Sequence, residues 1–346
     1  MNKNKIYIFV DIINYMMKYC IILILLLLTT LPDSVAVAFW NLENFFDPFV
    51  DSTLAYNEYT EGGAQHWTTA RFYQKRNNLY KAILKFSHHQ AIGIMGVCEV
   101  ENEFVLNALF RMTPLKRFNY RWVHYEGPDR RGIDPAIVYS MERFQLLCSR
   151  AIPYRDPDDV TRVSRDILYA KFFDYRQDTL HCFVNHWPSK YRGELETVEA
   201  RKHAATIGRH QVDSILAVVP DAKIIIMGDF NDTPDASCIR EVLGAKSVTE
   251  DGTLCNLFAN PNELGFDGTL KYQDSWMVFD QIIVTRSLFD SPTLHCRPSD
   301  AHIVHDDMLL TDDPTYHGKK LFRTYVGPKY YGGFSDHLPV LLLLRY

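Results

Sequence analysis

Polar residues that could bind a metal ion or move a proton follow several apolar segments of this chain. The clearest case is the β-branched run 224–226, which leads into Gly228-Asp229-Phe230-Asn231. Side chains two positions apart in an extended strand point to the same side, so a carboxylate and an amide are offered together where the strand ends. A polar turn after an ordinary strand would explain the same residues equally well. This string alone therefore suggests a site without defining its chemistry.

The same arrangement recurs along the chain. Open α/β sheets bind ligands at the ends of their strands, so we expect these polar groups to gather in one place. Six apolar strands each carry one or two such groups: Asn41 after 35–40, Glu99 after 92–98, His186 after 183–185, Asp229 and Asn231 after 224–227, Asp280 before 281–284, and Asp336 and His337 before 338–344.

Taken together, these strings resemble the DNase-I-like endonuclease/exonuclease/phosphatase superfamily over about residues 36–346. That family shows Trp-Asn after its first strand, a later Glu, a mid-chain His, Gly-Asp-x-Asn, an Asp before an apolar strand and a terminal Ser-Asp-His, and all six occur here in that order. The strings Asn185-His186-Trp187-Pro188-Ser189 and Arg131-Gly132-Ile133-Asp134 are similar to bacterial secreted members. The resemblance implies an α/β (α+β) fold, a four-layer α/β/β/α sandwich of two packed mixed sheets with outer helices.

The resemblance also implies metal-assisted hydrolysis of a phosphate ester. A phosphodiester is anionic, so its cleavage requires charge neutralisation, an activated water and a stabilised leaving group. Hard oxygen ligands suit Mg²⁺, with Mn²⁺ or Ca²⁺ as alternatives. The implied roles are His337 as general base or transition-state stabiliser, Asp280 as its orienting partner, Asp229 and Asn231 as groups that position water and bind phosphate, His186 as a donor to the phosphate or leaving oxygen, and Glu99 as metal ligand supported by Asn41 and Asp336.

Several cationic and aromatic residues near these strings are candidates for substrate contacts. A guanidinium group can bind two phosphate oxygens at once. For each cationic candidate, an ordinary solvated surface charge is an equal alternative. Aromatic rings could stack on a base, but such rings more often belong to a core. The candidates are Arg131, Lys190, Arg192 and Arg201 for phosphate, and Trp67, Trp187 and Tyr191 for stacking.

The first 34 residues differ from the rest of the chain. Lys18 precedes the apolar run 21–28, and smaller polar residues follow, which is typical of a secretory signal peptide. The run is short for a transmembrane helix, and an uncleaved N-terminal anchor is the alternative. We therefore expect a single domain over 35–346, a secreted or periplasmic protein, and no stable membrane partner after cleavage.

The net charge limits the possible partners. The formal charge is −5, and residues 1–34 contribute three lysines and two aspartates, so the remainder carries −6. A strongly basic surface for non-specific nucleic-acid binding is thus not expected, although local arginines and a divalent ion still permit a nuclease. We expect a monomer that acts on nucleic acid or another phosphodiester. A phosphatase or phospholipase for inositol phosphates or sphingomyelin is the alternative, followed by a non-catalytic binding protein.

Periodicity and cysteine placement complete the expectations. Helical spacing of apolar residues predicts helices over 70–86, 103–110 and 194–218, and alternation predicts a hairpin over 168–185. Six cysteines follow the first 34 residues. We expect Cys98, Cys148 and Cys182 to be small buried side chains, whereas a disulfide among Cys238, Cys255 and Cys296 is possible in an oxidising compartment.

Overall fold

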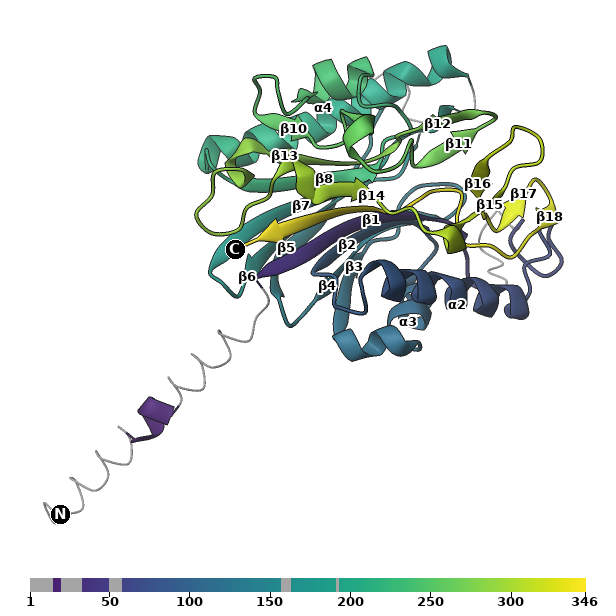
Figure 1. The fold of residues 1–346 in the computed structure, drawn as a ribbon, viewed down its shortest axis with the longest axis horizontal. Helices are drawn as coiled ribbons and strands as arrows, with labels where there is room; N and C mark the ends of the chain where they lie inside the picture. Colours follow the sequence, from purple (N-terminus) through teal and green to yellow (C-terminus); the bar gives the residue numbers. More distant parts are fainter. Residues whose placement is uncertain (1–14, 20–32, 50–57, 157–162, 191–192) are drawn as a thin grey trace, which may run out of the picture.

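Two mixed β-sheets pack face to face in the computed structural model, which describes residues 15–19, 33–49, 58–156, 163–190 and 193–346 (Figure 1). The first sheet has the order β14 (Ala301–Ile303), β19 (Val340–Arg345), β1 (Ser34–Phe45), β2 (Ile94–Val100), β4 (Asp134–Ser140) and β3 (Tyr120–His124). The second has the order β5 (Phe144–Ile152), β6 (Ile167–Asp174), β7 (Asp178–His186), β8 (Lys223–Asp229), β13 (Asp280–Thr285), β10 (Leu254–Asn256) and β9 (Ala245–Lys246).

Three helices cover the outer faces of the sandwich. Helices α2 (Thr69–Phe86) and α3 (Glu103–Phe110) lie against the first sheet, and α4 (Glu194–Val218) lies against the second (Figure 1). Thr68 caps α2 by accepting the N–H of Arg71 at 3.3 Å, which satisfies a backbone donor that the helix itself cannot use. The predicted four-layer sandwich is confirmed, and the three predicted helices have the expected bounds to within one residue.

The central strands of both sheets are apolar because both of their faces are covered. In the first sheet, β1 lies antiparallel to β19 and parallel to β2. In the second, β8 lies parallel to β7 and antiparallel to β13. The side chains of Phe39, Ile225 and Met227 are each fully buried. The polar residues expected at strand ends therefore lie at the ends of central, buried strands.

Three small hairpins form over residues 270–277, 310–321 and 325–330, where no helix or strand was predicted. They are β11 (Leu270–Tyr272) with β12 (Ser275–Met277), β15 (Leu310–Asp312) with β16 (Lys319–Leu321), and β17 (Tyr325–Val326) with β18 (Lys329–Tyr330). They lie at the end of the sandwich where β1 finishes (Figure 1). The C-terminal third of the chain thus builds the rim of that end.

The six described cysteines are all free, so the disulfide that we considered among Cys238, Cys255 and Cys296 does not form. These three thiols are buried, whereas Cys148 is exposed, contrary to expectation. The register of the edge strand β5 shifts between Leu146 and Cys148, and this bulge turns the Cys148 thiol to solvent. None of the described helices is long and apolar enough to cross a membrane, and the run 21–28 lies outside the described residues.

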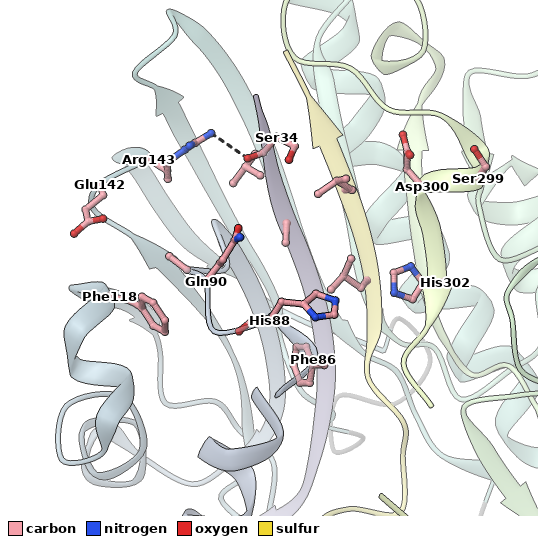
Figure 2. A pocket seen from close by; sticks show the side chains of 16 residues that line it. Ser34, Phe86, His88, Gln90, Phe118, Glu142, Arg143, Ser299, Asp300 and His302 are labelled. Carbon is pink, nitrogen blue, oxygen red and sulfur yellow. Dashed lines mark hydrogen bonds between the residues drawn. The ribbon is translucent and has the colours of Figure 1, made fainter. Parts of the chain in front are cut away.

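A groove of about 800 Å³ opens beside the C-terminal end of α2 (Figure 2). Ala36, Leu341 and Leu343 contribute its apolar surface, and the imidazoles of His88 and His302 lie on its rim. Since its β1 residues lie near the start of that strand, the groove is at the opposite end of β1 from the predicted site residues.

Candidate active site

Three predicted site residues meet where β7, β8 and β13 lie side by side. The strand register places His186 and Asp280 directly beside Asp229. Gly228 permits this approach, because a Cβ at that position would lie 2.3 Å from the carbonyl oxygen of Asn185. The second sheet therefore presents an imidazole and two carboxylates from adjacent strands.

The first sheet supplies Asn41 and Glu99 to the same place. The amide nitrogen of Asn41 lies 3.3 Å from Oε1 of Glu99 and 3.1 Å from Oδ2 of Asp229, so one side chain links the two sheets. Glu99 has a left-handed backbone (φ 61°), and its Oε2 accepts the N–H of Asn44 at 2.7 Å. The two carboxylates are thereby held together from different sheets.

His337 is fixed on both sides of its ring. Its Nδ1 lies 2.7 Å from Oδ2 of Asp280, and its Nε2 lies 3.8 Å from Oδ2 of Asp229. Burial alone would lower the pKa of His337, but the Asp280 and Asp229 carboxylates outweigh burial and raise that pKa well above its usual value. The surroundings of His337 therefore favour its protonated form, and its Nδ1 lies within hydrogen-bond distance of Asp280.

His186 faces the same carboxylates but has the opposite charge state. Its Nε2 lies 3.7 Å from both Oε1 of Glu99 and Oδ2 of Asp229. Burial lowers the pKa of His186 well below its usual value, and the charges of Arg165 and Arg131 lower it further. Its Nδ1 is buried without a hydrogen-bond partner among the described residues. His186 is consequently a neutral imidazole.

Asp229 lies between the two histidines and is itself perturbed. Burial raises the pKa of Asp229, and the neighbouring Asp280 and Glu99 charges oppose the lowering by His337. Its Oδ1 accepts the N–H of Asn231 at 2.9 Å, and Asn231 has a left-handed backbone with φ 51°. The Asn231 amide nitrogen donates to the carbonyl oxygen of Trp187 at 2.9 Å. The Gly-Asp-x-Asn string thus becomes a tight turn that aims both side chains into the site.

Two sets of side chains could hold a metal ion. Across the described part of the chain, the group of three ligand atoms found within 4.8 Å of one another belongs to Asp229, Asp280 and His337. The Nδ1 of His337 is already bonded to Asp280, and a protonated imidazole is a poor ligand. The carboxylates of Glu99 and Asp229, joined through Asn41, are the hard oxygen donors that Mg²⁺ prefers. The residues present therefore fit a divalent cation.

Asn41 and Asp336 were predicted to support the metal ion, and each has protein partners in the structure. Asn41 turns its amide nitrogen toward the carboxylates, while its oxygen accepts the N–H of Glu43 at 2.9 Å. Its contribution is to hold two carboxylates together. Asp336 accepts a hydrogen bond from Nη2 of Arg323 at 2.8 Å, so it is paired with a cation.

Three of the four residues predicted to contact phosphate lie beside aspartates in the structure. Arg201 is fully buried and donates from Nε to Asp232 at 2.8 Å, so the prediction that it contacts phosphate is replaced by a structural ion pair. Lys190 also pairs with Asp232, at 2.8 Å. Arg131 lies 3.5 Å from Asp129 and is close enough to influence His186. Arg192 lies outside the described residues.

The aromatic residues expected to stack on a base belong to the core instead. Trp67 donates from Nε1 to the carbonyl oxygen of Phe46 at 3.0 Å and is fully buried. Trp187 is 2% exposed and packs edge-on against Phe230. Tyr191 lies outside the described residues. Each tryptophan fills apolar space and finds a partner for its indole N–H, which explains its burial.

Four charged residues near the site were not predicted. Arg165 donates from Nη2 to the carbonyl oxygen of Trp187 at 2.9 Å, the same oxygen that receives Asn231. Glu43 was visible in the string Asn41-Leu42-Glu43-Asn44, two positions from a site residue, which is the one local signal available. The others lie in stretches without a motif: Lys75, Arg165 and Arg323.

Comparisons with known proteins agree with this geometry. A model of the endonuclease/exonuclease/phosphatase family matches residues 36–346. Among curated proteins, the protein angel of Drosophila melanogaster is 28% identical over 224 residues, which are 61% of this chain and 58% of that protein. The match thus spans a little over half of the curated relative.

Solved structures with TM-scores above 0.5 share the fold. A family protein from Bacteroides thetaiotaomicron has 16% identity and a TM-score of 0.55, covering 90% of this chain and 94% of its own. A mannosyl-6-phosphatase from the same organism has 16% identity and 0.53, with 90% and 100% covered. D. rerio TDP2 complexed with a single-strand DNA product has 14% identity and 0.52, with 91% and 100% covered.

Proposed function

This chain belongs to the endonuclease/exonuclease/phosphatase family, and on that basis we propose that it is a divalent-metal-dependent phosphodiesterase that cleaves nucleic acid. Members of this family hydrolyse phosphate esters, and the choice of nucleic acid as the substrate is our proposal. The observation that carries the proposal is the pair of histidines beside Asp229: Nε2 of His186 and Nε2 of His337 lie 3.7 and 3.8 Å from its Oδ2, and their surroundings favour a neutral His186 and a charged His337. His337 can then donate a proton to an anionic phosphate, whereas His186 adds no second positive charge to the site.

Each side chain has a distinct task in this proposal. A divalent cation bound by Glu99 and Asp229 would neutralise phosphate charge and lower the pKa of a bound water. The His337 imidazolium, held at Nδ1 by Asp280, donates from Nε2 to a phosphate oxygen and stabilises the charge that develops there. Asp229, whose Oδ1 accepts the N–H of Asn231, positions the attacking water beside that cation.

Asn231 and His186 complete the set. The Asn231 amide nitrogen is held by the Trp187 carbonyl, which leaves its amide oxygen to orient the attacking water. His186 is neutral and keeps one nitrogen toward Glu99 and Asp229, so it offers a hydrogen bond to the leaving oxygen without protonating the carboxylates. This division of labour follows from their surroundings, because burial favours the neutral form of His186 while the Asp280 and Asp229 carboxylates favour the charged form of His337.

The structural neighbours support two classes of substrate, a phosphodiester and a phosphomonoester. The TDP2 structure contains a single-strand DNA product, which supports a nucleic-acid substrate by analogy of fold. The mannosyl-6-phosphatase has the same fold and favours a phosphatase as the second candidate. A phospholipase is a further outcome of the experiment below.

The deciding experiment offers the full chain and His337→Ala a supercoiled plasmid, a single-stranded oligonucleotide, RNA, phosphorylated sugars and sphingomyelin vesicles, each with Mg²⁺ or EDTA. Digestion of nucleic acid that requires both Mg²⁺ and His337 supports the nuclease. Release of inorganic phosphate or phosphocholine with intact nucleic acid moves the protein to a phosphatase or phospholipase. Inactivity on every substrate contradicts the proposal and favours a binding protein. Parallel titrations with Mn²⁺ and Ca²⁺ identify the preferred ion.

We further propose that the protein is secreted or periplasmic, because Lys18 and the apolar run 21–28 have the pattern of a signal peptide. Fractionation of expressing cells followed by N-terminal sequencing tests this. Recovery of the chain outside the cytosol with its new N-terminus near residues 30–35 is expected. Recovery of the full-length chain in membranes would instead support an anchor, and recovery in the cytosol would contradict export.

A further inference from the structure

A group of four charged side chains lies next to His337, on the side of the site that the first sheet forms. Glu43 is 2% exposed, and its Oε2 lies 3.7 Å from Nζ of Lys75, which is fully buried. Its Oε1 lies 3.4 Å from Nε of Arg323, and Nη2 of Arg323 lies 2.8 Å from Oδ2 of Asp336. Two acids and two bases balance, so the group is neutral as a whole.

The chain around Arg323 is held firmly although it lies between short hairpins. The Glu43 carboxylate accepts the N–H of Thr324 at 2.6 Å and that of Tyr325 at 3.3 Å. Lys75 donates to the hydroxyl of Thr324 and, at 3.2 Å, to the carbonyl oxygen of Phe334. A buried carboxylate and a buried ammonium thus fix the backbone that carries the guanidinium.

Helix α2 also fixes the backbone at residues 332–333, which lies next to the segment that carries Arg323. The side-chain amide of Asn78 donates to the carbonyl oxygens of Gly332 and Gly333 at 2.9 and 3.0 Å. A Cβ on Gly333 would lie 2.1 Å from the carbonyl oxygen of Phe322, so the two arms of the segment are in close backbone contact. Arg323 has little freedom to move away from the site.

The Arg323 guanidinium has N–H groups that do not face Glu43 or Asp336. Of its five N–H groups, Nε and Nη2 face Glu43 and Asp336, which leaves the Nη1 edge of the fork. Its side chain is 41% exposed, whereas Lys75 and Arg165 are 0% and 7% exposed. Arg323 is therefore a cation beside the site that is both held in place and open to an incoming molecule.

We propose that Arg323 binds a phosphate oxygen of the substrate at this side of the site, and that Glu43 and Lys75 are positioning residues for it. The inference rests on the proposed function, because it takes the substrate to be a phosphate ester. A planar guanidinium matches a phosphate that presents two unesterified oxygens side by side. The inner edge of the fork stays on the two carboxylates while its outer edge meets the phosphate.

Steady-state kinetics of the full chain test the proposal. Arg323→Gln is expected to raise KM by about 10-fold to 100-fold while kcat stays within about threefold, since the contact is made in the ground state and kept in the transition state. Arg323→Lys should recover part of the loss, because it keeps the charge without the fork. Arg345→Gln is the matched control: Arg345 is 40% exposed and lies 2.6 Å from Asp300 on the opposite end of the first sheet.

Binding of inorganic phosphate, followed by calorimetry, gives a readout that does not depend on turnover. It should weaken about tenfold or more in Arg323→Gln and stay unchanged in Arg345→Gln, with thermal melting run alongside to verify the fold. Unchanged KM and phosphate affinity with a lowered melting temperature would mean that Arg323 only neutralises Glu43 and Asp336, and the proposal would be wrong. A loss of kcat at constant KM would overturn it too.

These outcomes separate the inference from the function on which it rests. If the wild-type chain hydrolyses no phosphate ester, the proposed function fails. The phosphate-binding comparison then still decides whether Arg323 recognises phosphate. If the wild type is active and Arg323→Gln binds and turns over substrate like the wild type, only the inference fails.

Discussion

The two ends of β1 differ in what surrounds them. Near its start, a groove of about 800 Å³ is lined by apolar side chains such as Leu341 and Leu343 and by polar ones that include Asp300 and His302 (Figure 2). Near its other end, Asn41 and His337 lie among buried carboxylates from both sheets, at 1% and 7% exposure. The two ends therefore differ in how their titratable side chains are arranged.

The difference teaches that mutual dependence between titratable side chains marks the candidate site. His337 has its charge because Asp280 and Asp229 face it, and Asp229 has its raised pKa because burial and neighbouring acids act on it. At the groove, burial lowers the pKa of His302, and the nearby His305 and His88 only add to that. Perturbed groups that perturb each other are a known feature of active sites.

The largest contrast should come from one histidine at each end. His337→Ala removes the donor that is aimed at the phosphate, so kcat is expected to fall by about 10²–10⁴-fold. His302→Ala at the groove should leave turnover within about twofold of wild type. Initial-rate assays on the best substrate of the panel, with circular dichroism to verify folding, make the comparison. Equal losses in both variants would assign a role in catalysis to the groove.

A smaller effect is expected from the partner of His337. Asp280→Asn keeps the side-chain shape but removes the charge that keeps His337 protonated, so its pKa falls. Because the charged form acts in our proposal, activity is present below that pKa and is lost as pH rises through it. The alkaline limb of the kcat profile should therefore move to lower pH, with kcat reduced by about tenfold or more at pH 8. An unmoved limb would mean that His337 acts in its neutral form.

Ion pairs at the two ends should differ in their effect on stability. Arg201 is fully buried against Asp232, which Lys190 also contacts, so Arg201→Met removes one of two cations from a buried carboxylate and is expected to lower the free energy of unfolding by about 2 kcal/mol. Arg345→Met breaks a partly exposed pair with Asp300 and should cost much less. Urea denaturation of both variants gives the comparison. Similar losses would show that burial does not separate these two pairs.

The smallest effect concerns pH and the groove. Because the folded state lowers the pKa of His302 below its unfolded value of 6.5, the unfolded chain binds the proton more tightly. The associated stability is complete above pH 6.5 and is lost as pH falls below it. His302→Gln should therefore flatten the dependence of the melting temperature on pH between 7 and 5. A steeper dependence in the variant would reverse the sign that we assign.

Much of this site was predictable because its signals are local. A strand followed by Gly-Asp-x-Asn places Asp229 and Asn231, and the same reasoning placed Glu99, His186, Asp280 and His337, which the structure brings together. The predicted helices depend on periodicity within single segments, which the sequence displays directly, whereas the four-layer sandwich was implied by the family resemblance.

The unpredicted features depend on partners that are far away in the chain. Arg201 and Asp232 are 31 positions apart, and Arg323 meets Glu43 across 280 positions, so nothing in either neighbourhood announces the pair. The exposure of Cys148 depends on a bulge, which is a property of strand pairing. Whether a charged residue is a surface cation or a buried partner is a tertiary question that composition does not answer.

The left-handed residues at the site have a consequence for engineering. Glu43, Asn44, Glu99 and Asn231 all have φ between 49° and 61°, a region that costs a residue with a side chain about 1 kcal/mol. Three of them use their side chains in contacts already described, but Asn44 gives Glu99 only its backbone N–H. Asn44 is thus a position where glycine could make the protein more heat-resistant while its rate is kept. At the other three, thermostability could be gained only by giving up catalytic contacts.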